Sequence, residues 1–504
     1  HHPGTLETLA DLGFSEPETA STIVRNWHRG RYRAMRSTRA RELLTELGPA
    51  LLTAIARGVD PDQALRRFDA FLAGLPAGVQ LFSLLHANPV LHDLLTEIMG
   101  SAPRLADTAA RNPLILDHVL SADFFDPPPD FARLRGALAE RLDQARDVED
   151  QLIAARRWSN DAKFQVGVQS LRNLIDVTRA GEALSDIADT AIVEFTSRIA
   201  QDFARSHGVF AHAQFAVLSM GKLGARELTE GSDLDLVFIY DIPGGNSQSD
   251  GQKPLAPGHY YQRFTQRLVT ALTAPTGDGK LYEVDLRLRP SGKSGPVSVT
   301  FETFANYQKD GAWTWEQMAL TRARIVTAPP GLSAKIEAVI AETLTQPRER
   351  LALKTDVAEM RARIEAEHAT TDPWHVKHVP GGLVDCEFIA QYLQLAHGAK
   401  HRQILSPATR SVFEAAAAAE LIDEATAQDL IDATLLWRRL QSMIRLCLAS
   451  RESTERGDNF PTALKNRLTD AEDVGSFAEL EARMADVRTR TRAIFIDLIG
   501  DPVS

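Results

Sequence analysis

The stretch GSDLDLVFIYD, residues 231–241, places two aspartates one residue apart at the start of an apolar run. The run is short, rich in β-forming residues and bounded by polar residues, which is typical of a strand in a covered sheet. On a strand, Asp233 and Asp235 would share one face at a separation of about 7 Å. Two carboxylates at that spacing can share a divalent cation, although the pair alone is weak evidence because most such pairs are solvated strand ends.

Two more strands are predicted nearby. QFAVLSM, residues 214–220, is short and apolar, and LYEVDLRLR, residues 281–289, alternates apolar with charged side chains. A charged face on an inner strand requires a ligand or a cleft. That face offers a third carboxylate, Asp285, and a basic edge made by Arg287, Arg289 and, in the following RPSGKSG, Lys293.

The segment SMGKLGARELTEGSD, between the first strand and the acids, is rich in glycine. Backbone amides there can approach a phosphate, and the segment fits neither a Walker loop nor a Rossmann fingerprint. Three carboxylates, a glycine-rich turn and several cations suit two-metal phosphoryl or nucleotidyl transfer. The candidate residues of the turn are Gly221, Lys222, Gly224, Gly231 and Ser232.

Helices are predicted on both sides of this region. RELLTELGPALLTAIARG, residues 41–58, has apolar residues at helical spacing, and one long helix is predicted over residues 133–164. The chain is helical again after Pro330. We therefore expect an α+β, predominantly helical protein with a small mixed sheet between two helical domains, and we place the domains at residues 3–132, 133–330 and 331–504. Residues 1–2 have the character of a tag remnant.

Composition narrows the functional classes. The 504 residues carry a net charge of −11, which disfavours nucleic acid as a partner. No window holds eighteen uninterrupted apolar residues and no signal peptide is indicated, so we expect no membrane partner and a cytoplasmic location. Cys386 and Cys447 are too few for a disulfide framework, in keeping with a reducing compartment.

Four longer stretches resemble a known family. MGKLGARELTEGSDLDLVFIYD, LYEVDLRLRPSGKSGPV, YQKDGAWTWEQMALTRARIV and GGLVDCEFIAQYL are together similar to the bacterial bifunctional glutamine synthetase adenylyltransferase/adenylyl-removing enzymes, members of the polymerase-β nucleotidyltransferase superfamily. The motif wording is closer to their C-terminal, adenylylating half. Those enzymes carry two such domains in tandem and this chain has one, so we expect a fragment or a shortened form.

The resemblance implies a chemistry for the acids. Asp233 and Asp235 would hold two Mg²⁺ ions, and Asp285 would complete the site beside the incoming hydroxyl and could accept its proton. A tyrosine of glutamine synthetase would attack the α-phosphorus of ATP and release pyrophosphate. The triphosphate would be bound by Lys222, Ser232, Arg287, Arg289 and Lys293. Either Ser219 or Ser232 would provide the hydroxyl donor that the superfamily usually has after its glycine turn.

Weaker candidates remain. Trp315, Ala319 and Arg322 would share a helical face, from which Glu316, Arg322 and Arg324 could reach the nucleotide; core packing explains the tryptophans equally well. Asp385 and Glu387 open a helix after a glycine turn, where acids also favour the helix dipole. Two histidine pairs have spacings that suit a metal but lack thiolates: His375 with His378, and His397 with His401.

Alternatives stay open. From the family, glutamine and the PII signal protein would be effectors. The same constellation could run the reverse chemistry, phosphorolysis of AMP-tyrosine on glutamine synthetase. A rival of another class is a non-catalytic, nucleotide-sensing helical adaptor, against which the third acid, Asp285, argues because binding alone has less need of a second metal.

Overall fold

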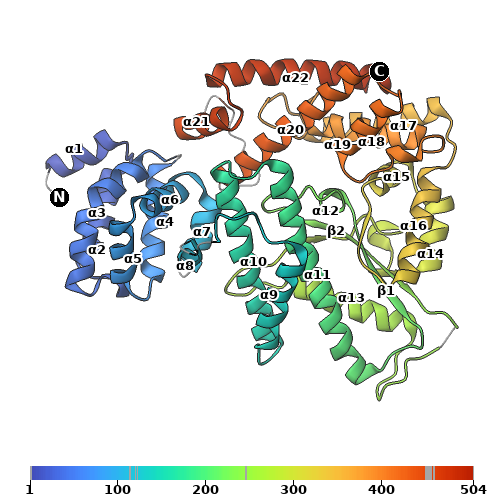
Figure 1. Cartoon of the computed structure of the whole chain (residues 1–504), viewed down its shortest axis with the longest axis horizontal. Coiled ribbons are helices and arrows are strands. Elements are labelled where there is room, and N and C mark those ends of the chain that lie inside the picture. The colour runs from blue at the N-terminus through green and yellow to red at the C-terminus, as the bar shows by residue number, and fades with distance from the viewer. Residues whose placement is uncertain are drawn as a thin grey trace. The chain divides into compact units, whose positions relative to one another are not determined.

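The computed structural model describes residues 3–58, 60–112, 115–119, 121, 123–244, 247–448, 457 and 460–502. The fold is predominantly helical with one mixed sheet of five strands, which confirms the expected fold class (Figure 1). Packing divides the chain into two compact units. Unit 1 is His1–Pro127, Asn160–Asp176 and Leu440–Glu481, and unit 2 is Pro128–Ser159, Val177–Arg439 and Ala482–Ser504. The expected tag remnant, residues 1–2, lies outside the described residues.

Unit 1 is entirely helical over its described residues. Its elements are α1 (Pro3–Leu12), α2 (Pro17–His28), η1 (Arg33–Met35), α3 (Thr38–Ala56), α4 (Pro61–Gly74), α5 (Gly78–Ala87), α6 (Pro89–Ser101), α7 (Pro103–Arg111), α8 (Ile115–Val119) and α21 (Thr462–Ala471).

Local sequence signals explain these helices. The apolar residues predicted to line one side of α3, Leu43, Leu44, Leu47, Leu51 and Ile55, are all buried. Side chains cap the following helices: the carboxylate of Asp60 accepts from the backbone N of Gln63 at 3.0 Å, and the amide oxygen of Asn88 accepts from that of Leu91 at 3.3 Å. Each cap stands directly before a proline at the first position of its helix, so both helices begin with a favourable local sequence.

Unit 2 contains the sheet. Its elements are α9 (Phe131–Asp143), α11 (Val177–His207), β1 (Gln214–Ser219), α12 (Gly221–Gly224), β2 (Leu234–Asp241), α13 (Pro257–Thr273), β3 (Val284–Asp285), η2 (Gly292–Ser294), β4 (Ser298–Thr300), α14 (Phe301–Asn306), η3 (Tyr307–Gly311), α15 (Thr314–Leu320), β5 (Arg324–Thr327), α16 (Pro330–Leu344), α17 (Arg350–His368), α18 (Leu383–His397), η4 (Arg402–Ile404) and α19 (Thr409–Ala418). Three helices contribute residues to both units: α10 (Val148–Leu171), α20 (Glu424–Cys447) and α22 (Phe477–Leu498).

The sheet is mixed, with strand order β3-β2-β1-β5 and β4 also paired with β2. Strand β1 runs antiparallel to β2 and β5, while β2 runs parallel to β3 and β4. The register aligns Leu234 with Val284 and Asp235 with Asp285. Two of the candidate acids therefore occupy facing positions on adjacent strands.

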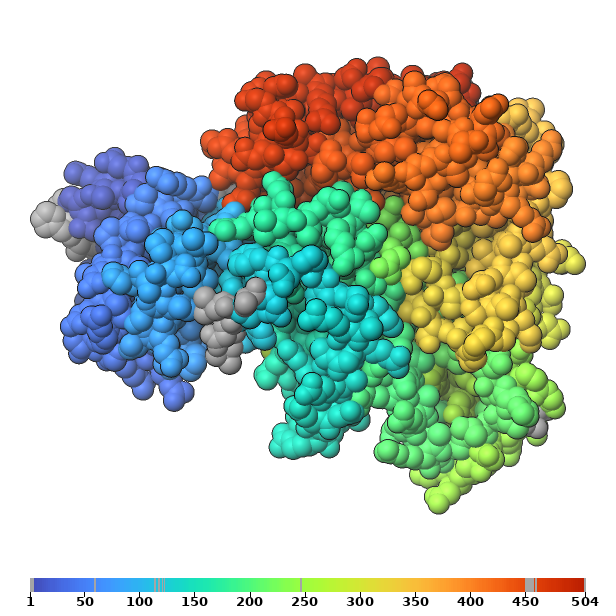
Figure 2. All heavy atoms as spheres, viewed as in Figure 1, coloured from blue at the N-terminus to red at the C-terminus, as the bar shows by residue number. Residues whose placement is uncertain are grey.

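The apolar part of β2 anchors these acids in the core. Val237 and Ile239 are buried in a cluster with Ala216 and Leu218 of β1 and with side chains of α16 and α18. In the space-filling view, the segment that holds α17 to α19 adjoins the segment that holds α14 to α16 (Figure 2). The helices that follow the sheet in sequence thus complete its hydrophobic core.

Two predicted elements are wrong in extent. The single helix predicted over residues 133–164 is two helices, α9 and α10, because Gln144 ends the first and the Asp147 carboxylate accepts from the backbone N of Asp150 to cap the second. The strand predicted over residues 281–289 pairs only at Val284–Asp285. The backbone N of Arg287 donates to the Asp285 carboxylate at 2.8 Å, and this turn takes the chain out of the sheet.

No helix in the described part of the chain is both long enough and apolar enough to cross a membrane. The expected division into three sequence domains stays a prediction, since the two compact units are defined by packing and each is made from three separate segments.

Candidate active site

The carboxylates of Asp235 and its neighbours form the electrostatic centre of the site. Asp233 is exposed and directly precedes β2, whereas Asp235 is partly buried within the strand. Burial, together with the negative charges of Asp233 and Asp285, raises the pKa of Asp235 to about 6. Because ionised Asp235 is unfavourable beside two other acids, a cation bound there would stabilise its charged form.

Asp285 is held by Arg287. Its carboxylate accepts from the Arg287 Nε at 2.6 Å and forms an ion pair with a terminal nitrogen of the same guanidinium at 2.5 Å. Burial raises the pKa of Asp285, but these hydrogen bonds outweigh it and hold the pKa below its ordinary value. Asp285 is therefore the more easily ionised member of the facing pair, and Arg287, which is largely exposed, balances its charge.

The glycine turn packs directly on these acids. Gly221 begins α12 with a φ of +57°, and a Cβ atom there would collide with the Asp235 carboxylate. Gly224 ends α12, and a Cβ atom there would collide with the backbone carbonyl of Arg322. Only glycine allows both close approaches, so these two residues of the predicted turn are required by packing.

Beyond the turn, polar side chains form a short chain of hydrogen bonds. Lys222 Nζ donates to Thr229 Oγ1 at 3.3 Å, and Thr229 Oγ1 lies 3.0 Å from Ser232 Oγ. The backbone N of Thr229 also donates to Ser232 Oγ at 3.2 Å, and Gly231, with a φ of +69°, closes the turn before β2. The structure thus brings the predicted lysine and Ser232 together through Thr229, which the sequence analysis did not single out.

Ser219 is the other candidate for the hydroxyl donor. It is fully buried at the end of β1, and its hydroxyl donates to the backbone carbonyl of Arg324 at 3.0 Å. Arg324 in turn donates to the carbonyls of Leu223 and Gly224 at 3.0 and 3.3 Å and pairs with Asp189 of α11. Both Ser219 and Arg324 thus hold the turn from its buried side.

Arg289 and Lys293 lie on the loop after β3. Arg289 is buried, and its guanidinium donates to four backbone carbonyls of the loop, those of Leu286, Lys293, Gly295 and Pro296. This bonding folds the loop around the arginine. Lys293 is exposed in η2. Burial raises the pKa of Asp285, the bonds and charge of Arg287 lower it, and the charge of Lys293 adds a smaller lowering effect. The predicted basic edge is therefore a compact loop beside Asp285 and not a continuous strand face.

Arg322 occupies a buried position between acids. Its terminal nitrogens lie 2.7 Å from carboxylate oxygens of Glu227 and Glu387. The prediction that it shares a helical face with Trp315 is wrong, because α15 ends at Leu320 and Arg322 follows in a turn. Burial and the charges of Asp233 and Asp285 raise the pKa of Asp235, and the positive charge of Arg322 opposes them with a smaller effect.

The core-packing explanation of the tryptophans is wrong for Trp313 and Trp315, which are 69 % and 40 % exposed. The segment that carries them is tied to the loop of Arg289. The Glu316 carboxylate accepts from the backbone N of Trp313 at 2.9 Å and from the Tyr307 hydroxyl at 2.8 Å, and that hydroxyl bonds to the backbone of Ser291. An exposed aromatic surface is thus fixed beside the basic loop.

The donor set fits Mg²⁺ in its chemistry, because hard cations prefer carboxylate oxygens and three carboxylates interact here. Within the described residues, however, no group of three or more His, Cys, Asp or Glu side chains is arranged to hold a metal ion. The histidine pairs form no such group either, and the ring of His378 stacks on that of His368 at 3.6 Å.

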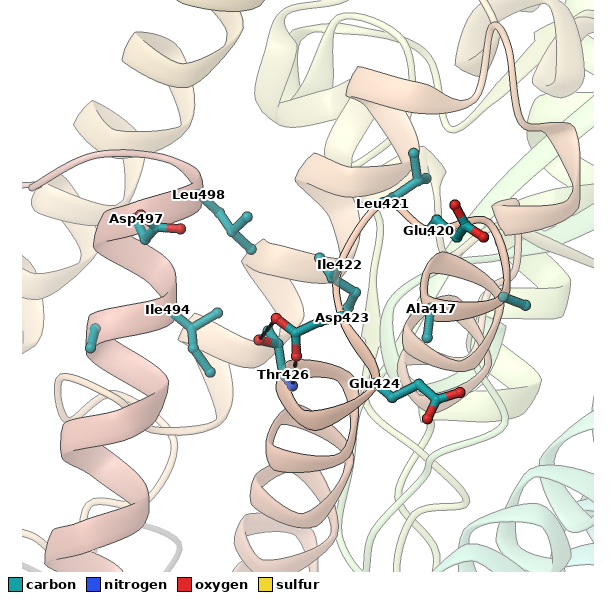
Figure 3. Close-up of a pocket in the computed structure, with 12 residues that line it drawn as sticks. Ala417, Glu420, Leu421, Ile422, Asp423, Glu424, Thr426, Ile494, Asp497 and Leu498 are labelled. Atoms are coloured by element: carbon teal, nitrogen blue, oxygen red, sulfur yellow. Dashed lines mark hydrogen bonds between the residues drawn. The ribbon is translucent and has the colours of Figure 1, made fainter.

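A separate groove lies in the same unit. It has a volume of about 980 Å³ between the loop that follows α19 and the helix α22, and none of the predicted site residues lines it (Figure 3). Its acids include Asp423, whose carboxylate accepts from the backbone N of Thr426 at 2.7 Å. This acid caps α20 and so has a structural role.

The residues that sequence reasoning missed are Glu227, Thr229 and Arg438. Glu227 and Thr229 lie inside the quoted glycine-rich segment, and their place in it is the signal that could have found them. Arg438 of α20 pairs with Glu227 at 3.3 Å although 211 positions separate them, and no local pattern indicates such a contact.

Comparison with known proteins identifies relatives of this chain. Residues 92–339 match the family model described as glutamate-ammonia ligase adenylyltransferase, and residues 353–499 match the one described as GlnD PII-uridylyltransferase. A relative from Mesorhizobium japonicum is 45 % identical over 98 % of this chain and 50 % of its own length, and is named bifunctional glutamine synthetase adenylyltransferase/adenylyl-removing enzyme. This chain is a homologue of those bifunctional enzymes.

Other enzymes of the same name give the same result. A relative from Brucella suis is 43 % identical over 99 % of this chain, and one from Xanthobacter autotrophicus is 44 % identical over 97 % of it. The chain spans about half the length of these adenylyltransferase/adenylyl-removing enzymes, 50 % and 49 % respectively. The resemblance stated from motifs is therefore confirmed over nearly the whole chain.

Proposed function

We propose that this chain transfers AMP from ATP to a tyrosine of glutamine synthetase and releases pyrophosphate, as the C-terminal half of a bifunctional enzyme. The observation that carries the proposal is the register that sets Asp235 opposite Asp285, with Gly221 of the glycine turn against the Asp235 carboxylate. Homology to enzymes named for this activity supports it. The sequences of the motifs support the assignment to the adenylylating half.

The three acids would hold the cofactor. Asp233 and Asp235 would bind two Mg²⁺ ions, which when bound neutralise the triphosphate and favour ionisation of the acceptor hydroxyl. Asp285 would first have to leave Arg287, and its carboxylate is then placed to accept the tyrosine proton. Arg287, once released, is a free cation at the same site and would serve the triphosphate.

The glycine turn and the basic loop would position the nucleotide. Lys222, Ser232 and Lys293 would be the side-chain donors to the nucleotide, and Lys222 and Ser232 would exchange their present bonds to Thr229 for it. Gly221, Gly224 and Gly231 let the backbone approach a phosphate. Arg289 and Ser219 would act through the backbone that they hold, because their donors are bonded to carbonyls. Arg322 would act on Asp235 through its charge.

The acceptor is proposed to be a protein and not a small molecule. Trp313 is the more exposed of two tryptophans on a segment that Glu316 and Tyr307 fix to the basic loop. Exposed tryptophan is frequent in protein interfaces and otherwise unfavourable on a surface. A protein chain that presents its tyrosine at Asp285 would therefore meet Trp313.

The experiment incubates the chain with ATP, Mg²⁺ and unmodified glutamine synthetase and measures the mass of the latter. Addition of one AMP per modified subunit supports the proposal, and no mass change with folded chain and active substrate refutes it. Incubating AMP-modified glutamine synthetase with phosphate tests the adenylyl-removing reaction, which the relatives' names also contain. Nucleotide binding without either reaction would favour the nucleotide-sensing adaptor.

Regulation by the PII signal protein and by glutamine is proposed for the helical residues 331–504. The match of residues 353–499 to a PII-uridylyltransferase model supports a connection with PII. The transfer assay repeated with PII and with glutamine tests this, and rates unchanged by either would contradict it. A cytoplasmic location is proposed too, because two unpaired, buried cysteines suit a reducing compartment that contains ATP.

A further inference from the structure

A buried cluster of charges joins the glycine turn to the helices that follow the sheet. Its four members are Glu227, Arg322, Glu387 and Arg438, whose side chains are 7 %, 6 %, 15 % and 6 % exposed. Arg322 bridges Glu227 and Glu387 at 2.7 Å to each, and Arg438 pairs with Glu227 at 3.3 Å. Buried charges are costly unless they are paired. Each charge of this cluster is therefore stable only while its oppositely charged partner is present.

The cluster is fixed to the site through the backbone. Arg322 presents its carbonyl to Gly224 at one end of α12, and the Asp235 carboxylate lies against Gly221 at the other end. Glu227 follows Arg226, which has a φ of +59° and pairs with Asp186 of α11. The cluster therefore sits one short helical turn away from Asp235.

Two of its members come from outside the segment that matches the adenylyltransferase model. Glu387 lies on α18 and Arg438 on α20, both in the part of the chain that matches the PII-uridylyltransferase model, residues 353–499. Glu227 and Arg322 lie in the other match, residues 92–339. All four belong to unit 2. Each pair between Arg322 and Glu387, and between Glu227 and Arg438, thus joins the two matched segments.

The acids and arginines of the cluster stabilise each other's charges, and this sets the electrostatic surroundings of a cation at Asp235. Burial disfavours the charge of Arg322, but Glu387 and Glu227 outweigh it and raise the pKa of its guanidinium. Burial opposes ionisation of Glu387, and Arg322 overcomes it and lowers the pKa of that carboxyl. Arg322 and Glu387 therefore both remain charged, and removing either one leaves its partner uncompensated near Asp235.

We propose that Glu387 and Arg438 are positioning residues of the transferase site, which hold Arg322 in place and set the net charge beside Asp235. The helices α18 and α20 are then a structural part of the catalytic centre, in addition to any role in regulation. This inference rests on the proposed function only for its activity readout, since cation binding is measured without glutamine synthetase.

The two substitutions have opposite electrostatic signs. Glu387→Gln leaves Arg322 less neutralised, which disfavours a cation at Asp235, so the Mg²⁺ concentration that gives half-maximal thermal stabilisation should rise at least threefold. Arg438→Met leaves Glu227 less neutralised, which favours a cation, so the same concentration should fall. Damage to packing alone would move both variants in one direction. The matched control is Glu414→Gln, which breaks an exposed 2.7 Å pair with Arg410 and should match wild type.

Activity gives the second readout. In both variants kcat for AMP transfer should fall about tenfold or more while the KM for ATP changes less than threefold, because Arg322 is displaced and the nucleotide donors are not. Wild-type Mg²⁺ midpoints and kcat in folded variants, or midpoints shifted in the same direction, would overturn the proposal. If Arg438→Met does not fold by circular dichroism, Glu387→Gln decides alone. A wild-type chain without transferase activity would refute the proposed function and leave the Mg²⁺ midpoints to decide the positioning role.

Discussion

Asp235 of β2 and Asp285 of β3 lie opposite each other on neighbouring parallel strands. Their side chains differ in charge behaviour, because Asp285 is paired with Arg287 whereas burial and the nearby acids raise the pKa of Asp235 to about 6. The facing pair thus combines a carboxylate whose ionised form is stabilised with one whose ionised form is destabilised, and several measurable consequences depend on that difference.

Asp235→Asn should make the protein more stable and inactive. The carboxyl pKa is higher in the folded chain than in the unfolded one, so at pH 7.5 ionised Asp235 costs stability that is regained as the pH falls through 6 toward 4. Removing the charge should raise the free energy of unfolding by up to about 3 kcal/mol in the absence of Mg²⁺. Thermal or urea unfolding measures this.

Mg²⁺ provides the control for that variant. It should stabilise the wild-type chain and stabilise Asp235→Asn much less, while AMP transfer is lost in the variant. Equal Mg²⁺ stabilisation of both proteins would show that Asp235 holds no cation.

Gly221→Ala should damage both stability and activity. A Cβ atom would meet the Asp235 carboxylate, and the φ of +57° is strained for alanine, so we expect a loss of about 1–3 kcal/mol and a lower kcat. The matched control is Gly136→Ala in α9, where a Cβ atom meets nothing within 4 Å and φ is not positive. Gly136→Ala should raise the free energy of unfolding by about 0.5–1 kcal/mol. Urea unfolding of both variants compares them, and a neutral Gly221→Ala contradicts the packing of the turn on Asp235.

Trp313→Ala should weaken binding of the protein acceptor and not of the nucleotide. Because Trp313 is 69 % exposed, its removal leaves the core intact, and the KM for glutamine synthetase should rise about tenfold with the KM for ATP unchanged. Steady-state kinetics with each substrate varied in turn measures the two constants. Phe125→Ala, a substitution of an exposed aromatic residue in unit 1, serves as the control. A rise in both KM values would assign Trp313 a structural role instead.

His378 should cause part of the loss of stability in acid. Burial, followed by the charges of Lys377, His368, Arg361 and His375, lowers the pKa of His378 to about 3. Because the unfolded side chain binds a proton near pH 6.5 and the folded one does not, stability should fall as the pH decreases from 6.5 toward 3. Melting temperatures of His378→Gln should fall less steeply over that range than those of wild type. The exposed His259→Gln should follow wild type, and parallel slopes for all three proteins would refute the assignment.

Local signals predicted much of the fold. The apolar run of β2 and the apolar spacing of α3 act over a few residues, and the structure has both elements where the sequence indicates them. The break between α9 and α10 was also encoded locally, by Asp147 three residues before Asp150, but the apolar spacing on either side masked it. Helical periodicity alone is therefore a poor guide to where one helix ends.

The site was predicted in composition more than in geometry. Alternation in residues 281–289 predicted a strand, yet a hydrogen bond from the Arg287 backbone to Asp285 ended it after two paired residues. Periodicity cannot reveal a side chain that competes for its own backbone. The contact between Glu227 and Arg438 depends on tertiary packing over 211 positions, which no spacing rule contains.

The assembly of each unit from three separate segments has a consequence for biosynthesis. Residues 440–481 belong to unit 1 and residues 482–504 to unit 2, so neither core is complete until residues 440–504 have left the ribosome. Arg438 of the charge cluster is also made more than two hundred residues after Glu227. During translation Glu227 therefore lacks its pairing with Arg438 over this interval, and chaperones that hold nascent chains would be expected to act on it.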